Sequence, residues 1–235
     1  MRYEKPKGYR PILSVSSDAK TIKGEKLNVL TAVAYLAPHE SSGYGNVCPM
    51  ATDGCIATCL GRYSGHMVME QVRKAQNDKV RLFFTDNALF LACLRHDIRK
   101  LVRKAKRKGM RPAVRINGSS DLPKVSIAMS QEFPDVTFYD YTKIPRPWTR
   151  ETSNYHITFS RSENNERDCM DVLEHGGNVA VLFAGDRPTT WHGYKVIDGD
   201  LHDVRFLDSR NVVVGLRPKG GPARRDTSGF VVLAA

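Results

Sequence analysis

Three cysteines within twelve positions are the residues of this chain best suited to chemistry. Cys48, Cys55 and Cys59 form the pattern C-x6-C-x3-C, so one loop carries three thiols. Three thiolates leave one position of a tetrahedral zinc ion unfilled, or one iron of a cubane iron–sulfur cluster free. The spacing is neither the C-x2-C pair of zinc ribbons nor a ferredoxin pattern. It predicts a metal centre, with three buried free thiols as the alternative.

The fourth ligand of such a centre would come from His66, Cys93, Cys169 or the substrate. Cys93 lies in the apolar stripe of a predicted helix, which favours a place in the core, and Cys169 lies in a polar helix. His66 is close in sequence, although a single histidine is more often an ordinary surface residue. We expect a [4Fe-4S] cluster in preference to zinc, because three clustered cysteines without an evident partner suit a cluster with one open iron.

Polar side chains gather where the later apolar segments of the chain end. The candidate catalytic or substrate-binding residues there are Asn117, Ser119, Asp121, Tyr139, Lys143, Ser160 and Lys219. Either lysine could donate to an anionic ligand, and a buried Lys or Tyr could transfer protons, because burial and neighbouring charge tune its pKa. The alternatives are that polar residues merely begin loops and that Asp121 caps a helix beginning at Leu122 and Pro123.

The elements that must position these residues alternate between strands and helices. Short apolar segments predict strands at 29–37, 112–116, 136–139, 156–159, 179–183, 194–197 and 212–216. Helices are expected at 66–84, 87–108, 124–133 and 163–175, the second of them ending at Gly109. This alternation predicts an α/β fold with mainly parallel strands, in which the carboxyl ends of the strands share one face.

The chain length of 235 residues fits one domain of ordinary size. Residues 1–25 are polar and rich in lysine and are expected to form an N-terminal arm. Residues 26–235 are expected to form a single α/β domain. We expect this domain to be a partial or complete (β/α) barrel, with the cysteine loop near its N-terminal end.

The charge balance favours polyanionic partners. Lys and Arg number 36 against 25 Asp and Glu, a formal net charge of +11. Much of the excess lies on the helix expected at 87–108, where the candidate phosphate contacts are Arg99, Arg103, Lys104, Lys106 and Arg107. Contact with a nucleic-acid backbone is one interpretation and a solvated helix face is the other, since no helix-turn-helix, zinc-finger or RNP signature accompanies these residues.

Two further features concern acidic residues and location. The acidic cluster of Asp198, Asp200, Asp203 and Asp208 does not follow the spacing of an EF-hand. This favours turns and salt bridges to Arg205 and Arg210 over a calcium site.

No apolar segment approaches the roughly 20 residues needed to span a bilayer, and residues 1–8 contain no apolar signal region. We therefore expect a cytoplasmic protein without a membrane partner.

Several blocks together resemble the phage "gene product 88" family, whose function is largely unknown. They are C-P-x5-C-x3-C-L at 48–60, R-x-N-G-x-S-D at 115–121, Tyr139-Asp-Tyr-Thr-Lys143, Thr158-Phe-Ser160, the acidic segment at 198–208 and Gly215-Leu-x-x-Lys219-Gly220. The resemblance spans roughly residues 25–233. It implies a phage context, hence the host cytoplasm, and nucleotides or nucleic acid as substrates.

A looser similarity links the chain to radical S-adenosylmethionine enzymes, which place a three-cysteine cluster before the strands of a partial (β/α) barrel. Their usual loop is C-x3-C-x2-C, whereas this one is C-x6-C-x3-C, and no clear methionine-binding glycine stretch follows. The similarity therefore implies a cluster with an open iron but not that S-adenosylmethionine binds it.

The first functional hypothesis is an iron–sulfur enzyme of redox or radical type that acts on a small-molecule or nucleotide substrate. The alternative is a zinc-stabilised nucleic-acid-binding protein without catalysis, with His66 or another group completing the zinc site.

Overall fold

The computed structural model describes residues 4–15 and 19–233. Its strands are β1 (Leu13–Val15), β2 (Val29–Ala34), β3 (Arg111–Arg115), β4 (Thr137–Thr142), β5 (Tyr155–Ser160), β6 (Asn178–Ala184), β7 (Thr190–Trp191), β8 (Tyr194–Asp198), β9 (Val213–Leu216) and β10 (Val232–Leu233). Its α-helices are α1 (Ala19–Glu25), α2 (Asp53–Ala57), α3 (Leu60–Tyr63), α4 (Glu70–Thr85), α5 (Asn87–Lys108), α6 (Pro123–Glu132), α7 (Glu166–Glu174) and α8 (Gly221–Arg224). Three short 3-10 helices are η1 (Gly65–Val68), η2 (Pro147–Thr149) and η3 (Arg205–Leu207).

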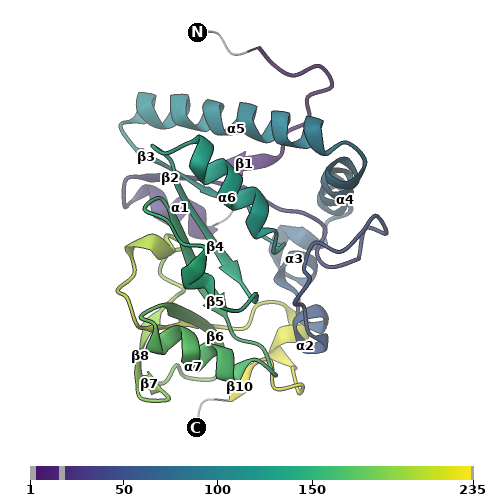
Figure 1. Cartoon of the computed structure of the whole chain (residues 1–235). Coiled ribbons are helices and arrows are strands. Elements are labelled where there is room, and N and C mark those ends of the chain that lie inside the picture. The colour runs from purple at the N-terminus through teal and green to yellow at the C-terminus, as the bar shows by residue number, and fades with distance from the viewer. Residues whose placement is uncertain (1–3, 16–18, 234–235) are drawn as a thin grey trace.

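One mostly parallel sheet organises the molecule (Figure 1). The strands pair in the order β1-β2-β3-β4-β5-β6-β9-β8-β7, and β10 adds to the end of β6. Strands β2 to β6, β9 and β8 run parallel, while β1 and β7 pair antiparallel with their neighbours. The prediction of an α/β fold with mainly parallel strands is confirmed.

The sheet is open. Within the described residues β1 and β7 are its two edges, and no strand pairing joins them. The expectation of a complete barrel is therefore wrong. The physical reason lies in the two ends, where short antiparallel strands close off the parallel order instead of extending it into a ring.

Side chains alternate between the two faces of the sheet. Leu30 of β2, Val114 of β3 and Phe138 of β4 belong to the largest core cluster, together with buried residues of α5 and α6. Their neighbours in sequence, Ala113 and Tyr139 among them, face the opposite side, where the segment around η3 covers them. Helix α7 packs on the same side as α5 and α6, further along the sheet, over β5 and β6. Three crossover helices thus cover one face.

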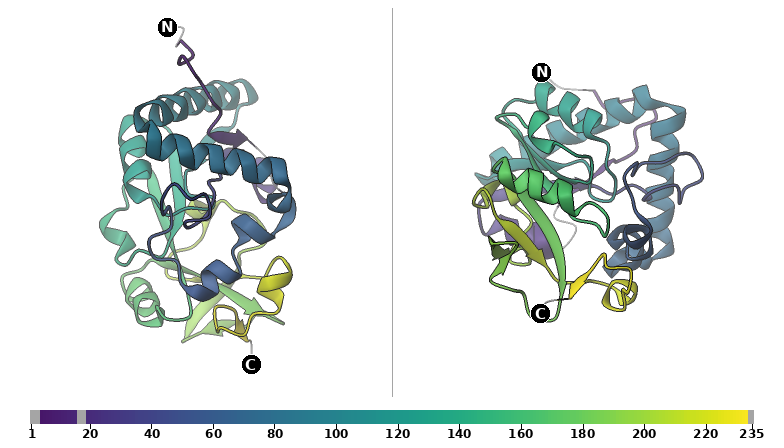
Figure 2. Two further views of the ribbon diagram at one scale, coloured as in Figure 1. Left: turned by 90° about the vertical axis from the view of Figure 1, so that its right-hand side faces the viewer. Right: turned by 60° about the horizontal axis from the view of Figure 1, so that its bottom comes forward.

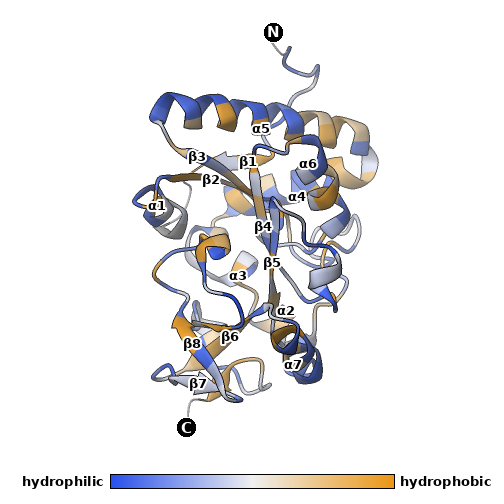
Figure 3. Ribbon diagram, turned by 60° about the vertical axis from the view of Figure 1, so that its left-hand side comes forward, coloured by the Kyte–Doolittle hydropathy of each residue, from blue (hydrophilic) through white to orange (hydrophobic). Residues whose placement is uncertain are grey.

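Helix α5 has the predicted bounds. Asp86 caps its beginning by accepting a hydrogen bond from the Leu89 amide, and Gly109 ends it in the left-handed conformation at φ 65°. Cys93 is fully buried on its inner face, as its place in the apolar stripe predicted. Figure 3 shows a more hydrophobic N-terminal half and a more hydrophilic C-terminal half of this helix.

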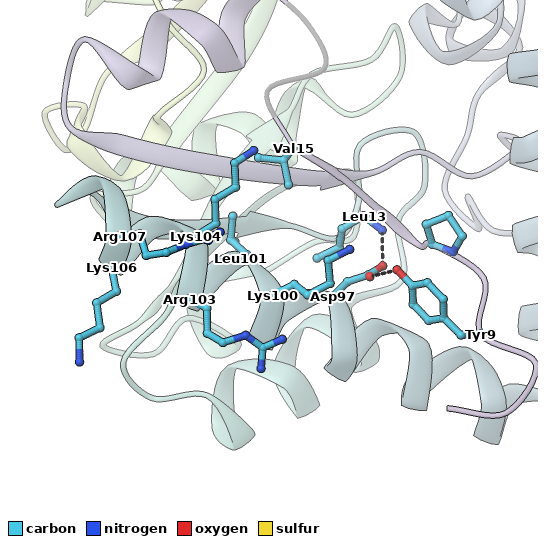
Figure 4. A pocket seen from close by; sticks show the side chains of 11 residues that line it. Tyr9, Leu13, Val15, Asp97, Lys100, Leu101, Arg103, Lys104, Lys106 and Arg107 are labelled. Carbon is cyan, nitrogen blue, oxygen red and sulfur yellow. Dashed lines mark hydrogen bonds between the residues drawn. The ribbon is translucent and has the colours of Figure 1, made fainter. Parts of the chain in front are cut away.

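The segment before β1 is attached to α5 through one buried carboxylate. Asp97 accepts hydrogen bonds from the Tyr9 hydroxyl and from the backbone amides of Ile12 and Leu13 (Figure 4). An acidic residue in the apolar stripe of α5 therefore acts as the docking point for residues 9–13.

Candidate functional site

A cavity of about 570 Å3 opens at the carboxyl ends of the parallel strands. All three cysteines of the cluster line it, as does His66 of η1. The cavity also collects most of the predicted polar residues, namely Asn117, Ser119, Asp121, Lys143, Ser160 and Lys219. Among the predicted catalytic or substrate-binding residues, Tyr139 alone lies outside it. The cysteine loop and the strand ends, which come from distant parts of the sequence, thus share one cavity.

Glu163 fixes the beginning of α2, the helix that carries Cys55. Its two carboxylate oxygens accept hydrogen bonds from the Gly54 amide (2.8 Å) and the Thr52 hydroxyl (2.7 Å). The Thr52 oxygen in turn accepts from the Cys55 amide as the N-cap. A side chain at position 54 would collide with Ser228 and Glu163, so the close approach requires glycine.

The C-terminal segment closes the cavity beside these short helices. Figure 2 shows it in yellow next to the blue helices α2 and α3. Gly220, with φ 84°, lies so close to the Tyr63 carbonyl that a Cβ atom would stand 2.6 Å from the oxygen. Arg161, beyond β5, donates to the carbonyls of Gly229 and Phe230. The wall formed by residues 220–230 is therefore tied to both the cysteine loop and the sheet.

Cys48 is joined to the loop after β3. Its thiol donates to the Ser119 carbonyl at 3.6 Å, and its sulfur accepts from the His39 amide at 3.4 Å. A second link runs from the Asp121 amide to the Val47 carbonyl at 2.7 Å. The first cysteine is consequently held against the end of β3.

Cys59 stands at the N-cap position of α3. A Cβ atom on Gly61 would lie 2.6 Å from the Ser119 Cβ and 3.7 Å from the Cys59 sulfur, so α3 approaches the same loop closely. Buried Gln76 of α4 donates to the Gly61 carbonyl at 3.2 Å. Helix α4 thereby holds the third cysteine in place.

Burial controls the protonation of these thiols. It raises the pKa of Cys48 to about 12, against a smaller opposing effect of the His39 amide, and it also raises the pKa of Cys59. The Gly61 and Arg62 amides and the Lys143 ammonium partly offset burial at Cys59 by lowering its pKa. At neutral pH the metal-free site holds protonated thiols at these two positions, and a metal must displace those protons.

No group of three His, Cys, Asp or Glu side chains within residues 4–15 and 19–233 is arranged to hold a single metal ion. A tetrahedral zinc ion with Zn–S bonds of about 2.3 Å needs sulfurs about 3.8 Å apart. In a cubane each thiolate binds a different iron, so the ligands need not converge on one point.

Asn117 is occupied by structural hydrogen bonds. Its backbone amide donates to Asp140 at 2.8 Å, and its side-chain nitrogen donates to the same carboxylate at 2.9 Å. Its side-chain oxygen accepts from the Ser120 hydroxyl and the Leu122 amide. Ser126 and Tyr155 complete the shell around the buried Asp140. Asn117 therefore shapes the turn after β3 although it lines the cavity.

Asp121 joins the ends of β3 and β4. One carboxylate oxygen accepts from the Thr142 hydroxyl and the other from the Lys143 amide, both at 2.8 Å. The N-cap of α6 is Leu122, so the alternative that Asp121 caps this helix is wrong. Its hydrogen bonds instead fix the backbone from which Lys143 projects.

Lys143 and Lys219 differ in their surroundings. The Lys143 ammonium lies 3.3 Å from the Ser160 hydroxyl and over the ring of Phe230. Lys219 is 45% exposed and stands 3.5 Å from an oxygen of Asp200. Lys143 is the better placed of the two to meet a ligand inside the cavity.

Tyr139 and Tyr141 share one face of β4, opposite Asp140. Their hydroxyls lie 3.5 Å from the two oxygens of Asp203. Tyr139 is fully buried among Val29 and its neighbours, below the cavity rather than in its wall. The sequence predicted Tyr139 as a site residue, but Tyr141 is the tyrosine of β4 that lines the cavity.

The sequence analysis missed the pair formed by Arg115 and Asp203. Both line the cavity, and their side chains approach to 2.9 Å. Arg115 sits in the R-x-N-G-x-S-D block, but nothing in the sequence indicates a partner 88 positions away. Of the two arginines predicted to pair with the acidic cluster, Arg205 does so, with Asp208 at 3.1 Å, whereas Arg210 pairs with Glu151.

The basic residues of α5 form a separate surface. A cleft of about 860 Å3 between α5 and residues 9–15 is lined by Arg103, Lys104, Lys106 and Arg107, with Lys100 beside them (Figure 4). Arg99 lies outside this cleft and pairs with Glu132 at 3.6 Å. Four of the five predicted phosphate contacts thus lie around one cleft.

Comparison with known proteins gives one family match. A family model described as gene product 88 matches residues 11–234. No curated protein matches the chain, and neither does any solved structure. Across the described residues, no helix is long and apolar enough to cross a membrane.

Proposed function

This chain belongs to the gene product 88 family, and we propose that it is an iron–sulfur protein in which Cys48, Cys55 and Cys59 hold a [4Fe-4S] cluster. The observation that carries the proposal is the shared cavity: the three thiols of one loop line the same space as the polar ends of the parallel strands. Sites in parallel α/β folds are commonly built at that end of the sheet.

The chemistry of the donor set fits a cluster. Three thiols face one partly apolar cavity, and backbone amides of His39 and Gly61 point toward two of the sulfurs. Hydrogen bonds to sulfur and the surrounding solvent exposure are the means by which proteins tune a cluster. His66 also lines the cavity and remains the candidate for a fourth ligand.

When bound, the cluster would supply one-electron chemistry and an open iron position. The residues of this chain would bind and orient the substrate beside it. Lys143 and Ser160 offer adjacent donors, and Asp121 fixes the backbone that carries Lys143. We therefore propose a redox or radical-type enzyme for a small-molecule or nucleotide substrate.

Two broader proposals accompany this one. The sequential order β2 to β6 has the strand order of a partial (β/α) barrel, and we propose that relationship for the open sheet. We also propose a cytoplasmic location, because the proposed cluster needs Cys48, Cys55 and Cys59 to be reduced, and the cytosol keeps thiols reduced.

The test is anaerobic purification followed by a visible spectrum and iron and sulfide analysis. We expect a brown protein with about four irons and four sulfides per chain. Cys48→Ala, Cys55→Ala and Cys59→Ala should each lose most of that content. Cys93→Ala and Cys169→Ala, which change buried thiols outside the cavity, are the matched controls. A colourless protein with equal metal content in all five variants would refute the cluster.

A second candidate function rests on the cleft beside α5. Among the described residues, Arg103, Lys104, Lys106 and Arg107 form no ion pair, although carboxylates pair with Arg95 and Lys108 on the same helix. Unneutralised cations on one surface favour a polyanion such as a nucleic-acid backbone. In this alternative the cysteines hold structural zinc and the protein has no catalytic activity.

Binding to a labelled DNA duplex at several salt concentrations tests this alternative. Arg103→Gln and Lys104→Gln should weaken binding, and each should reduce the slope of log K against log salt by about 1. Lys74→Gln on α4 serves as a control for the loss of one surface charge. Unchanged slopes in the α5 variants would exclude phosphate contacts at this surface.

A further inference from the structure

We propose that the cavity contains a subsite for an oxyanion of the substrate, a carboxylate or a phosphate, and that Arg115 binds it. The inference deepens the proposed function and rests on it, because it names the substrate class of the same cavity. It depends on three observations: the hydrogen bonding of Arg115, the charge of the cavity wall and the size of the cavity.

Arg115 is the last residue of β3, and its side chain is only 15% exposed. One terminal nitrogen donates to Asp203 at 2.9 Å, and the guanidinium lies over the Tyr141 ring, 4.5 Å from its centroid. These two contacts fix the plane of the group. They use one part of a fork that carries five N–H donors.

Within residues 4–15 and 19–233, the rest of that fork makes no hydrogen bond. Nε of Arg115 is buried and makes no hydrogen bond to any described residue. Among the described residues, Asp203 is the only hydrogen-bond acceptor of the guanidinium. A buried group with unused donors is unfavourable unless a ligand or water satisfies it. Because Arg115 lines the cavity, the part of its guanidinium that faces this space can donate to an oxyanion bound there.

The wall around Arg115 favours a negative ligand. Four Lys or Arg side chains of the described chain line the cavity, namely Arg115, Lys143, Lys219 and Arg224, against two carboxylates, Asp121 and Asp203. Both oxygens of Asp121 are occupied by Thr142 and the Lys143 amide, and Asp203 is paired with Arg115. Lys219 is partly exposed and paired with Asp200, and Arg224 is exposed, so Arg115 and Lys143 are the cations best placed to attract an anion into the cavity.

The volume of about 570 Å3 sets the scale of the ligand. It lies within the roughly 300–1,000 Å3 of ordinary small-molecule sites. A molecule of metabolite size, anchored by its oxyanion at Arg115, would share the cavity with the three thiols that also line it. We assign the substrate to the class of small carboxylic acids or phosphate esters.

Calorimetric titration at constant ionic strength tests the subsite. The probes are inorganic phosphate and malonate, and the protein is used as purified anaerobically. Binding of phosphate alone identifies a phosphate ester, binding of malonate alone identifies a carboxylic acid, and binding of either supports the subsite. Arg115→Lys keeps the charge but loses the fork, so it should weaken the bound probe roughly 10- to 100-fold.

Arg210→Gln is the matched control, because it removes an arginine that is 73% exposed and outside the cavity. The double variant Arg115→Gln/Asp203→Asn removes both charges together, which avoids leaving Asp203 buried and unpaired, and it should abolish binding. Circular dichroism verifies that each variant folds. The inference is overturned if neither probe binds the wild-type protein, or if Arg210→Gln weakens binding as much as Arg115→Lys does.

Iron and sulfide analysis of the same samples separates this inference from the proposed function. Loss of probe binding with unchanged iron content in Arg115→Lys supports the subsite beside an intact cluster. Absence of iron from the wild-type protein refutes the cluster whatever the anion titration shows. Normal iron content with no anion binding refutes the subsite alone.

Discussion

At the scale of single residues, the carboxyl ends of the strands carry two kinds of polar side chain. Asn117 and Asp121 direct their oxygens at the protein itself and hold the turns after β3 and β4 together. Lys143, Arg115 and the three thiols instead line the cavity with donors or sulfurs that a ligand can meet. This division indicates which substitutions should affect folding and which should affect binding.

Asn117→Ala should lower the free energy of unfolding by about 3 kcal/mol. The substitution removes one donor to the buried Asp140 and the acceptor for Ser120 and Leu122, and each unsatisfied buried group costs roughly 1–3 kcal/mol. Urea unfolding measures the change. Asn87→Ala, at an exposed position of α5, should change it by less than about 0.5 kcal/mol, and similar values for the two variants would contradict this role.

Asp208 should make stability depend on pH between about 4 and 6. Its pKa is raised to about 6, chiefly by burial and also by the nearby Asp203, and the ion pair with Arg205 at 3.1 Å offsets this only in part. That pair lacks a well-directed hydrogen bond, since both participating atoms have no hydrogen-bond partner. The folded protein therefore binds the proton more tightly than the unfolded chain, and the free energy of unfolding falls as pH rises through this window.

Asp208→Asn should flatten that part of the curve, whereas Asp226→Asn should not. Asp226 is the control because its pKa is lowered by hydrogen bonds from the Val231 amide and the Ser228 hydroxyl and amide, which together outweigh burial. Unfolding in urea at pH 4, 5, 6 and 7 checks the prediction. An unchanged slope in Asp208→Asn would show that another group titrates.

The sequence predicted single residues well where the signal was local. Three cysteines on one loop and polar residues at strand ends are local patterns, and the structure brings them to one cavity. Arg115 with Asp203 and Glu163 with Gly54 are pairs 88 and 109 positions apart, and no local pattern records them. The exchange of Tyr139 for Tyr141 follows from depth along the strand, since only the later tyrosine reaches the cavity wall.

At the scale of elements, length and periodicity decided what could be predicted. Helix α5 has a long apolar stripe and clear end signals, so its bounds followed from the sequence. The parallel strands are short apolar segments and were predicted to within a few residues. Helices α2 and α3 have five and four residues, too few for a periodic signal, and Glu163 and Gln76 hold them through contacts distant in sequence.

Gly118→Ala should destabilise the protein more than Gly109→Ala does. At the end of β3 a Cβ atom on Gly118 would stand 2.6 Å from the Ala34 carbonyl oxygen, so β2 and the turn must separate. We expect a loss of about 2–3 kcal/mol from such overpacking. At the end of α5, Gly109 has open space but a φ of 65°, and alanine there should cost about 1 kcal/mol.

Urea unfolding of both glycine variants provides the comparison. The iron content of the two variants is a second measurement, because Ser119, next to Gly118, contacts Cys48 and α3. Gly118→Ala should reduce iron content, and Gly109→Ala should leave it unchanged. Equal stability of the two variants would mean that β2 and the turn adjust without cost.

At the scale of the whole molecule, the sheet and the cavity depend on different information. The alternation of strands and helices specifies parallel pairing. Closure of the sheet into a barrel depends on how the two edge strands pair, and β1 and β7 pair antiparallel with their neighbours. The cavity wall includes residues from Tyr35 to Phe230, so it exists only in the assembled fold. Any ligand that binds only this folded cavity must stabilise the entire molecule.

That linkage yields a prediction that separates a metal-binding cysteine from a structural one. Cys48→Ala should lower the melting temperature of iron-loaded protein to that of metal-free wild type, and it should leave the metal-free protein nearly unchanged. Cys93→Ala, which truncates a fully buried side chain in the core, should lower the loaded and metal-free forms equally. A ligand at 100 times its dissociation constant stabilises the fold by about 2.7 kcal/mol, enough to resolve in a thermal scan. If Cys48→Ala destabilised both forms as Cys93→Ala does, Cys48 would be a packing residue, and its thiol would not be a metal ligand.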